Sequence, residues 1–199
     1  MLSRLFKQLA HMRASPADTP EASRPLKLHI GGRTPHPDWK IVDVKAGEHT
    51  DYVGSCTDLT QFADGSVAEI YASHVLEHLG YQKDLPRALA EFRRVLVPDG
   101  LLRVSVPDLT TLCQLFLSGE LDTAARFHVM RMMFGGQLDD ADFHLVGLNE
   151  EFLAYYLRRA GFVDVRRVES LGLFQDSSVL VFAGRPISLN MVGHAPASC

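Results

Sequence analysis

Short apolar runs alternate with amphipathic helical runs from residue 26 onward, and this alternation restricts the fold more than any other feature of the chain. Strand-like runs read KLHI, KIVDV, DYVGS, VAEIYAS and GLLRVSVPD. A helical run, DLPRALAEFRRV, separates the last two, and three more follow Asp108, Asp122 and Asn149, each a suitable N-cap. The final runs, FVDVRRVES and SSVLVFAGRPISLNMVGH, have no helix between them and can pair antiparallel. The pattern predicts an α/β fold, a mostly parallel sheet flanked by helices with an antiparallel strand pair at its C-terminal edge.

The length of 199 residues suits one domain with a buried core. We expect a short amphipathic helix and a flexible linker at 1–25, and the folded domain at 26–199. The helix would be frayed or dock on a partner or, less favourably, lie on a membrane surface. No run is long enough for a transmembrane segment, and the net charge of −4 gives no reason to expect nucleic acid. Three widely spaced cysteines favour a reducing, cytoplasmic setting over disulfides or a zinc site.

A glycine pair follows the first predicted strand, and a carboxylate ends the second. Gly32 and Asp43 are eleven positions apart, with two prolines between them, which leaves no room for a regular helix. A dinucleotide fingerprint requires G-x-G-x-x-G, a helix and an acidic residue about 20 positions on, so a nicotinamide oxidoreductase is disfavoured. Ligands of open α/β sheets bind outside the carboxyl ends of the strands. We therefore expect Gly31, Asp43, Ser55 and Ser73 to lie along one rim of the sheet.

The order of these segments resembles that of the class I S-adenosylmethionine (SAM) dependent methyltransferases, and most closely the small bacterial type-11-like members. The resemblance covers about residues 26–193 and rests on LHIGG…DWKIVDV, DYVGSCTDLTQFADGSVAEIYASHVLEHL, ALAEFRRVLVPDGLLRVSVPDL and RRAGF. It implies a Rossmann-like fold, SAM as cofactor and transfer of its methyl group to an acceptor. The sequence does not identify the acceptor, for which a small molecule or a glycan precursor is a working assumption.

The resemblance also implies where the cofactor lies. Asp43 is expected to accept hydrogen bonds from the ribose hydroxyls, and the alternative is an aspartate that only caps its loop. The turn after the first strand and the loops after the third and fourth strands supply the other contacts. The expected cofactor-binding residues are Gly31, Gly32, Asp43, Ser55, Cys56, Asp58, Ser73 and His74.

Two positions depart from the family pattern. Arg33 stands where the common G-C-G turn has its second glycine, and Ser55 stands where a G-D-A loop has an aspartate. Asp58, in the same loop, could substitute for that aspartate. These departures define the alternative function, a degenerate methyltransferase fold that binds a partner without catalysis.

The segment SHVLEH carries the candidate chemistry after the fourth strand. His74 and His78 are four positions apart, but the spacing is not H-E-x-x-H and no third ligand is evident, so we predict no metal site. An oxygen acceptor needs a base near neutral pH, and histidine is the suitable residue. His78 and His144 are the predicted catalytic residues. The alternative is that Glu77 and His78 merely begin a helix.

Overall fold

The computed structural model describes residues 26–198, so the predicted N-terminal helix and linker lie outside the described residues. Every helix in this range is too short or too polar to span a bilayer. The elements in chain order are β1 (Leu26–Ile30), β2 (Lys40–Asp43), β3 (Tyr52–Val53), β4 (Val67–Ser73), η1 (Leu76–His78), α1 (Asp84–Val95), β5 (Leu96–Pro107), α2 (Leu109–Leu117), α3 (Thr123–Phe134), α4 (Glu150–Arg159), β6 (Val163–Val168), η2 (Ser177–Val179), β7 (Val181–Phe182), β8 (Arg185–Pro186) and β9 (Ser188–His194).

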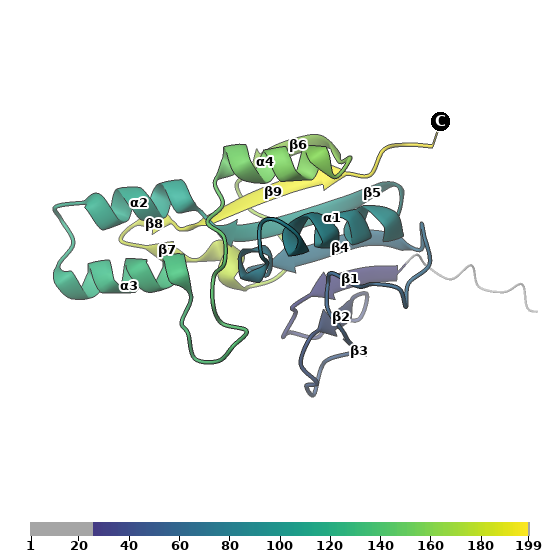
Figure 1. Cartoon of the computed structure of the whole chain (residues 1–199), viewed down its shortest axis with the longest axis horizontal. Helices are drawn as coiled ribbons and strands as arrows, with labels where there is room; N and C mark the ends of the chain where they lie inside the picture. The colour runs from purple at the N-terminus through teal and green to yellow at the C-terminus, as the bar shows by residue number, and fades with distance from the viewer. Residues whose placement is uncertain (1–25, 199) are drawn as a thin grey trace, which may run out of the picture.

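Seven strands form one sheet in the order β3-β2-β1-β4-β5-β9-β6 (Figure 1). The first five are parallel, and β9 pairs antiparallel with both β5 and β6. This confirms the predicted α/β, Rossmann-like sheet with an antiparallel strand pair at its C-terminal edge. The last strand is shorter than predicted, because 177–187 forms η2 and a small β7–β8 hairpin. Ala183 and Gly184, both at positive φ, turn the chain back in that hairpin.

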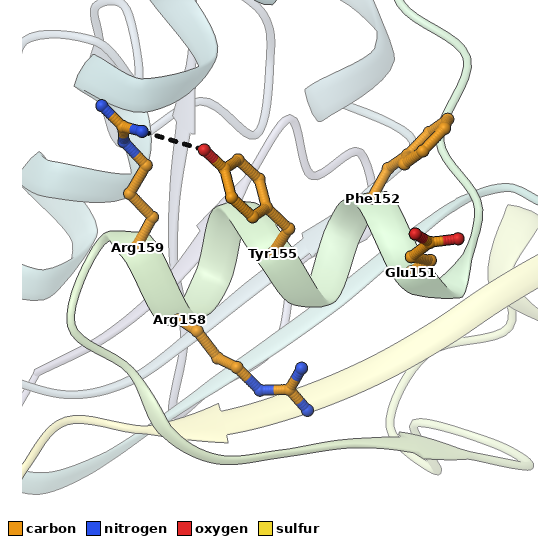
Figure 2. Close-up of a pocket in the computed structure, with 5 residues that line it drawn as sticks. All are labelled: Glu151, Phe152, Tyr155, Arg158 and Arg159. Atoms are coloured by element: carbon orange, nitrogen blue, oxygen red, sulfur yellow. Dashed lines mark hydrogen bonds between the residues drawn. The ribbon is translucent and has the colours of Figure 1, made fainter.

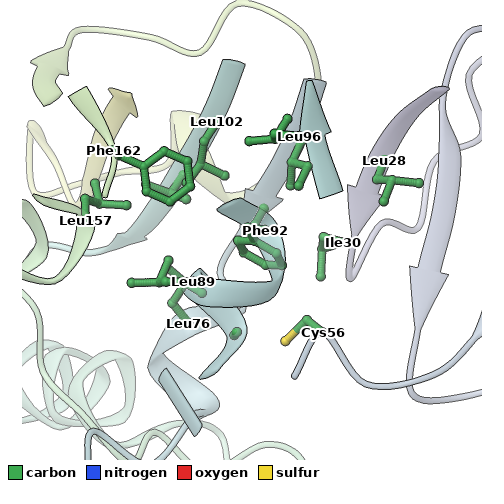
Figure 3. Close-up of a cluster of buried hydrophobic side chains, with 14 of the residues drawn as sticks. Leu28, Ile30, Cys56, Leu76, Leu89, Phe92, Leu96, Leu102, Leu157 and Phe162 are labelled. Atoms are coloured by element: carbon green, nitrogen blue, oxygen red, sulfur yellow. The ribbon is translucent and has the colours of Figure 1, made fainter. Parts of the chain in front are cut away.

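One face of the sheet carries the main core, which α1 and α4 cover together (Figures 1 and 3). Alternate strand residues such as Leu28 and Leu102 point into it, and Phe92 of α1 and Leu157 of α4 meet them. These four side chains are fully buried. Each contributes about 1.5–3 kcal/mol through burial of its apolar surface.

The opposite face carries a smaller, mixed layer. Trp39, Tyr71 and Phe174 pack edge to face there. In the same layer Glu69 forms ion pairs with Lys27 of β1 and Arg103 of β5. No helix connects β1 to β2 in the described chain, as the two prolines predict. The segment that contains Phe174 therefore provides part of the cover for this face.

Beyond the carboxyl ends of β4 and β5, the helices α2 and α3 and the β7–β8 hairpin gather into a small lobe (Figure 1). The predicted caps are present: Asp108 accepts from the first turn of α2, and Asp122 from that of α3. Leu112 of α2 and Val129 of α3 are buried in a small apolar cluster between the helices. The lobe positions the chain after α3 beside the exit of β4.

Candidate functional site

The glycine turn after β1 packs against the protein's own side chains. Gly31 has a φ of +67°, and a Cβ there would lie 2.6 Å from Cγ2 of Val75. A Cβ on Gly32 would lie 2.5 Å from the ring of His29. Real Cβ contacts are not this short, so both positions require glycine for close approach of the turn to the β4 exit and to β1.

Asp43, at the end of β2, is half-buried beside this turn. Its Oδ1 accepts a hydrogen bond from the Lys45 amide at 2.7 Å, a local loop contact. Its backbone carbonyl accepts from the Gly54 amide at 2.9 Å, which holds the loop after β3 next to it. Asp43 thus makes the hydrogen bond expected of an aspartate that caps its own loop, and its Oδ2 is left for another donor.

The three predicted residues of the loop after β3 have different surroundings. Ser55 shares a hydrogen bond of 2.8 Å with the Thr57 hydroxyl. Asp58 is exposed and accepts from the hydroxyl and amide of Thr60. Cys56 lies in the main core, where burial raises the pKa of its thiol to about 11. The Cys56 side chain is therefore an inert part of the core, and a cofactor contact is left to its backbone.

A row of polar side chains crosses the sheet at its carboxyl end. Ser73 of β4 is in register with Ser105 of β5, which is in register with Asn190 of β9. The hydroxyls of both serines and Oδ1 of Asn190 are buried without a hydrogen-bond partner among residues 26–198. Buried polar atoms in proteins are almost always paired. The two hydroxyls, which can donate or accept, and the amide oxygen, which accepts, are consequently suited to bind a polar ligand group or ordered water.

His74 follows Ser73 in a strained backbone conformation, with φ +54°. Its Nε2 lies 2.9 Å from Oγ of Ser188, and this hydroxyl donates to the carbonyl of Ser177 at 2.7 Å. Since the hydroxyl proton is committed to that carbonyl, Nε2 of His74 is the donor and Nδ1 is unprotonated. The ring is held by β9, so a cofactor contact through Nε2 would break this bond.

The structure brings both predicted catalytic histidines together. His78 ends η1, and His144 lies in the segment between α3 and α4; their ring centroids are 4.9 Å apart with the planes near perpendicular. The amides of Leu145 and Val146 donate to the carbonyl of Glu77 at 2.7 and 3.3 Å, which fixes this segment against η1. The sequence predicts each histidine as a catalytic residue but contains no signal that the two side chains meet.

Glu77 is the residue whose environment the sequence least reveals. Its side chain is 2% exposed, and both carboxyl oxygens lack a hydrogen-bond partner in the described chain. Burial raises the pKa of Glu77 to about 8, and burial lowers the pKa of His74 to about 4. The 3.3 Å contact between Oε1 of Glu77 and Nδ1 of His74 therefore joins two neutral groups near pH 7. Burial and the neighbouring His78 also lower the pKa of His144.

Two surface hollows lie elsewhere. One, of about 680 Å³, runs along the outer side of α4 and is lined by Phe152, Tyr155 and the arginines at the helix end (Figure 2). The other, of about 410 Å³, lies between the starts of α2 and α4, with Asp108 and Arg167 on its wall. Neither includes the glycine turn or the histidine pair.

Comparisons with known proteins agree with this architecture. Residues 38–104 match the family model described as a methyltransferase domain, a range that holds Asp43, Ser73 and His78 but not the glycine turn or His144. No curated protein sequence matches the chain.

Solved structures share the fold at low sequence identity. A SAM-dependent methyltransferase from Archaeoglobus fulgidus is 14% identical, with a TM-score of 0.53 over 84% of this chain and 85% of that one. A possible histamine N-methyltransferase from Thermotoga maritima is 17% identical, with a TM-score of 0.53 over 85% and 82%. A chain from the Haloferax volcanii complex of the Trm112 activator with a methyltransferase is 14% identical, with a TM-score of 0.51 over 86% and 83%. The sequence match over 38–104 and the shared Rossmann-like fold confirm the resemblance to the class I SAM-dependent methyltransferases of the type-11-like kind.

Proposed function

We propose that the chain binds SAM at the rim formed by the turn after β1, the end of β2 and the exit of β4, and that it transfers the methyl group to an acceptor. The single observation that carries this proposal is the placement of Gly31, Asp43 and Ser73 at the ends of three adjacent strands, β1, β2 and β4. The open Oδ2 of Asp43 suits ribose hydroxyls, and the unpartnered hydroxyls of Ser73 and Ser105 suit the polar amino-acid end.

SAM supplies a methyl group already activated by its sulfonium. The protein then mainly has to hold the two reactants in line, and good orientation lowers the barrier by about 7–11 kcal/mol. In this proposal His78 and His144 face the acceptor, because they lie beside the β4 exit and within one cluster. An imidazole there accepts the proton of an acceptor hydroxyl. A small-molecule or glycan-precursor acceptor stays a working assumption.

A non-catalytic binding module is the second candidate, and one observation favours it. Val75 and His29 already fill the space that glycines commonly leave for a ligand, and the two surface hollows lie away from the rim. In a module of this kind the rim would be closed by the protein itself.

Calorimetric titration with SAM and S-adenosylhomocysteine, and with NAD as the negative ligand, separates the candidates. The wild-type chain should bind the first two and not NAD. Asp43→Asn should weaken SAM binding by about 10- to 100-fold, as expected for the loss of a hydrogen bond to a charged group. Asp38→Asn, an exposed aspartate in the β1–β2 loop, is the matched control and should bind like wild type. Absence of binding to the wild-type chain would support the module, and equal affinities of the two variants would remove Asp43 from the site.

A further inference from the structure

We propose that Glu77, His78 and His144 form a binding site for a divalent transition-metal ion such as Zn²⁺ or Mn²⁺. Binding of the ion stands on this chain's own geometry, and only its use in catalysis rests on the proposed methyl transfer. The sequence predicts no metal because no third ligand is evident near His78. The fold supplies that ligand from a position 66 residues further along the chain.

The three side chains lie close enough to one another to bind one metal ion after small movements. One ligand atom from each of them lies within 4.8 Å of the other two. Ligands at about 2.0–2.2 Å from a tetrahedral ion are about 3.3 Å apart, so modest side-chain rotations would close the site. Glu77 and His78 lie in η1, and His144 lies in the segment between α3 and α4. Hydrogen bonds from the amides of Leu145 and Val146 to the Glu77 carbonyl fix these two segments to each other.

The hydrogen bond of His78 leaves its Nε2 free to bind a metal ion. Its Nδ1 lies 3.0 Å from the carbonyl of Phe143, and since a carbonyl only accepts, Nδ1 carries the proton. The lone pair is then on Nε2. A metal-bound histidine in proteins typically donates its other N–H to a carbonyl or carboxylate in this way, which orients the ring.

The burial of the unpartnered Glu77 carboxyl group is the independent observation that points to a cation. Its carboxyl group is fully buried, both oxygens lack a hydrogen-bond partner, and no lysine or arginine pairs with it among residues 26–198. An unpaired buried carboxylate costs several kcal/mol. The group is therefore either protonated or neutralised by a cation, and the two histidines place such a cation beside it.

The ligand types indicate the class of ion. Imidazole suits Zn²⁺ and other first-row transition ions, whereas Mg²⁺ and Ca²⁺ prefer all-oxygen sites. Three protein ligands leave at least one position open, as in catalytic zinc sites. With the ion bound, both histidines would be ligands and neither could act as the base, so an acceptor hydroxyl in that position would have a lowered pKa and release its proton to solvent instead of to an imidazole. Its oxygen would form the new bond to the methyl carbon as the carbon–sulfur bond breaks, leaving S-adenosylhomocysteine.

Metal content measures the site without any assay of catalysis. The full chain is stripped with a chelator, incubated separately with Zn²⁺, Mn²⁺ or Mg²⁺, desalted and analysed by elemental mass spectrometry. The wild-type chain should retain about one Zn²⁺ or Mn²⁺ and no Mg²⁺. His144→Ala and Glu77→Gln should each weaken retention by at least about 100-fold in chelator competition. His49→Ala, an exposed histidine of the β2–β3 loop, is the control and should match wild type.

Circular dichroism checks that each variant is folded. If Glu77→Gln does not fold, His144→Ala, which lies in a surface segment, still tests whether the site binds metal. A wild-type chain that retains no transition metal would overturn the proposal, as would equal retention by His144→Ala and His49→Ala. SAM titration of the stripped wild-type chain separates the two hypotheses. Normal SAM binding without metal retention refutes only the metal site, whereas metal retention without SAM binding supports the metal site and refutes the proposed function.

Discussion

His29 makes the stability of this protein depend on pH, and replacement by phenylalanine should remove that dependence. The ring is 4% exposed at the end of β1, stacked on Phe174 at 4.1 Å between centroids and edge-on to Tyr71 at 5.0 Å. Its Nδ1 is buried without a partner in the described chain. Burial lowers the pKa of His29 to about 4, and the negative charge of Asp176 opposes this only in part. A phenylalanine keeps the aromatic contacts and has no proton to bind.

The sign and size of the effect follow from linkage. In the unfolded chain His29 binds a proton as pH falls through about 6.5, whereas in the folded chain it stays neutral until about pH 4. Protonation therefore favours the unfolded state, and the contribution of His29 to stability is complete above pH 6.5 and is lost as pH falls toward 4. The difference of about 2.5 pKa units, at 1.36 kcal/mol per unit, gives about 3 kcal/mol in total. Of this, about 2 kcal/mol is lost between pH 7 and pH 5.

Urea unfolding followed by circular dichroism at pH 7, 6 and 5 measures the effect. Between pH 7 and pH 5 the wild-type free energy of unfolding should fall by about 2 kcal/mol more than that of His29→Phe. The comparison cancels all groups that titrate alike in both proteins. His49→Gln, at an exposed position, should retain the full wild-type dependence. Parallel pH dependences of wild type and His29→Phe would refute the assignment of a buried, neutral His29.

Two further substitutions test the packing around this residue. Gly32→Ala would place a Cβ 2.5 Å from the His29 ring and should lower the free energy of unfolding, measured with urea, by about 1–3 kcal/mol. Gly119→Ala is the control, because a Cβ there would have nothing within 4 Å. It should leave the free energy of unfolding unchanged or raise it by about 0.4–1 kcal/mol. Tyr71→Phe removes the hydroxyl that donates to Asp176 at 2.8 Å, and should lower stability in the same assay by about 1.5–3 kcal/mol; an unchanged midpoint would show that this bond is not maintained in solution.

The features that the sequence predicts correctly are those that neighbouring residues determine. Asp108, Asp122 and Asn149 each cap the helix that they precede, because a cap needs only a short polar side chain and the amides two or three positions on. The strand ends at Ile30, Asp43 and Ser73 follow in the same way from short apolar runs that stop at a glycine pair or a polar residue. No local pattern predicts the order of the strands in the sheet, which the structure shows to be β3-β2-β1-β4-β5-β9-β6.

The features that the sequence does not reveal depend on contacts between distant segments. His144 meets His78 only because the lobe returns the chain to the β4 exit, so a search for a third metal ligand near His78 could not find it. Glu77, a charged residue between Leu76 and His78, gives no sign in the sequence that it is completely buried. The continuous apolar run within 177–187 is typical of a strand, but Ala183 and Gly184, both at positive φ, fold this segment into a hairpin, and β9 begins only afterwards.

The distribution of buried oxygens without a hydrogen-bond partner indicates where we expect the functional part of the rim to lie. Elsewhere in the sheet a buried carboxylate such as Glu69 is paired on both sides, as is usual in proteins. Ser73, Ser105 and Asn190, which cross the sheet in register, and Glu77 just beyond them keep unpartnered oxygens at one end of β4 and β5. Unpaired buried oxygens are costly, so a fold that retains several of them together is best explained by a ligand or ion that pairs with them there. The glycine turn after β1, in contrast, is already packed. We therefore expect the proposed binding site to be centred on the β4 exit, with the β1 turn and Asp43 at its border.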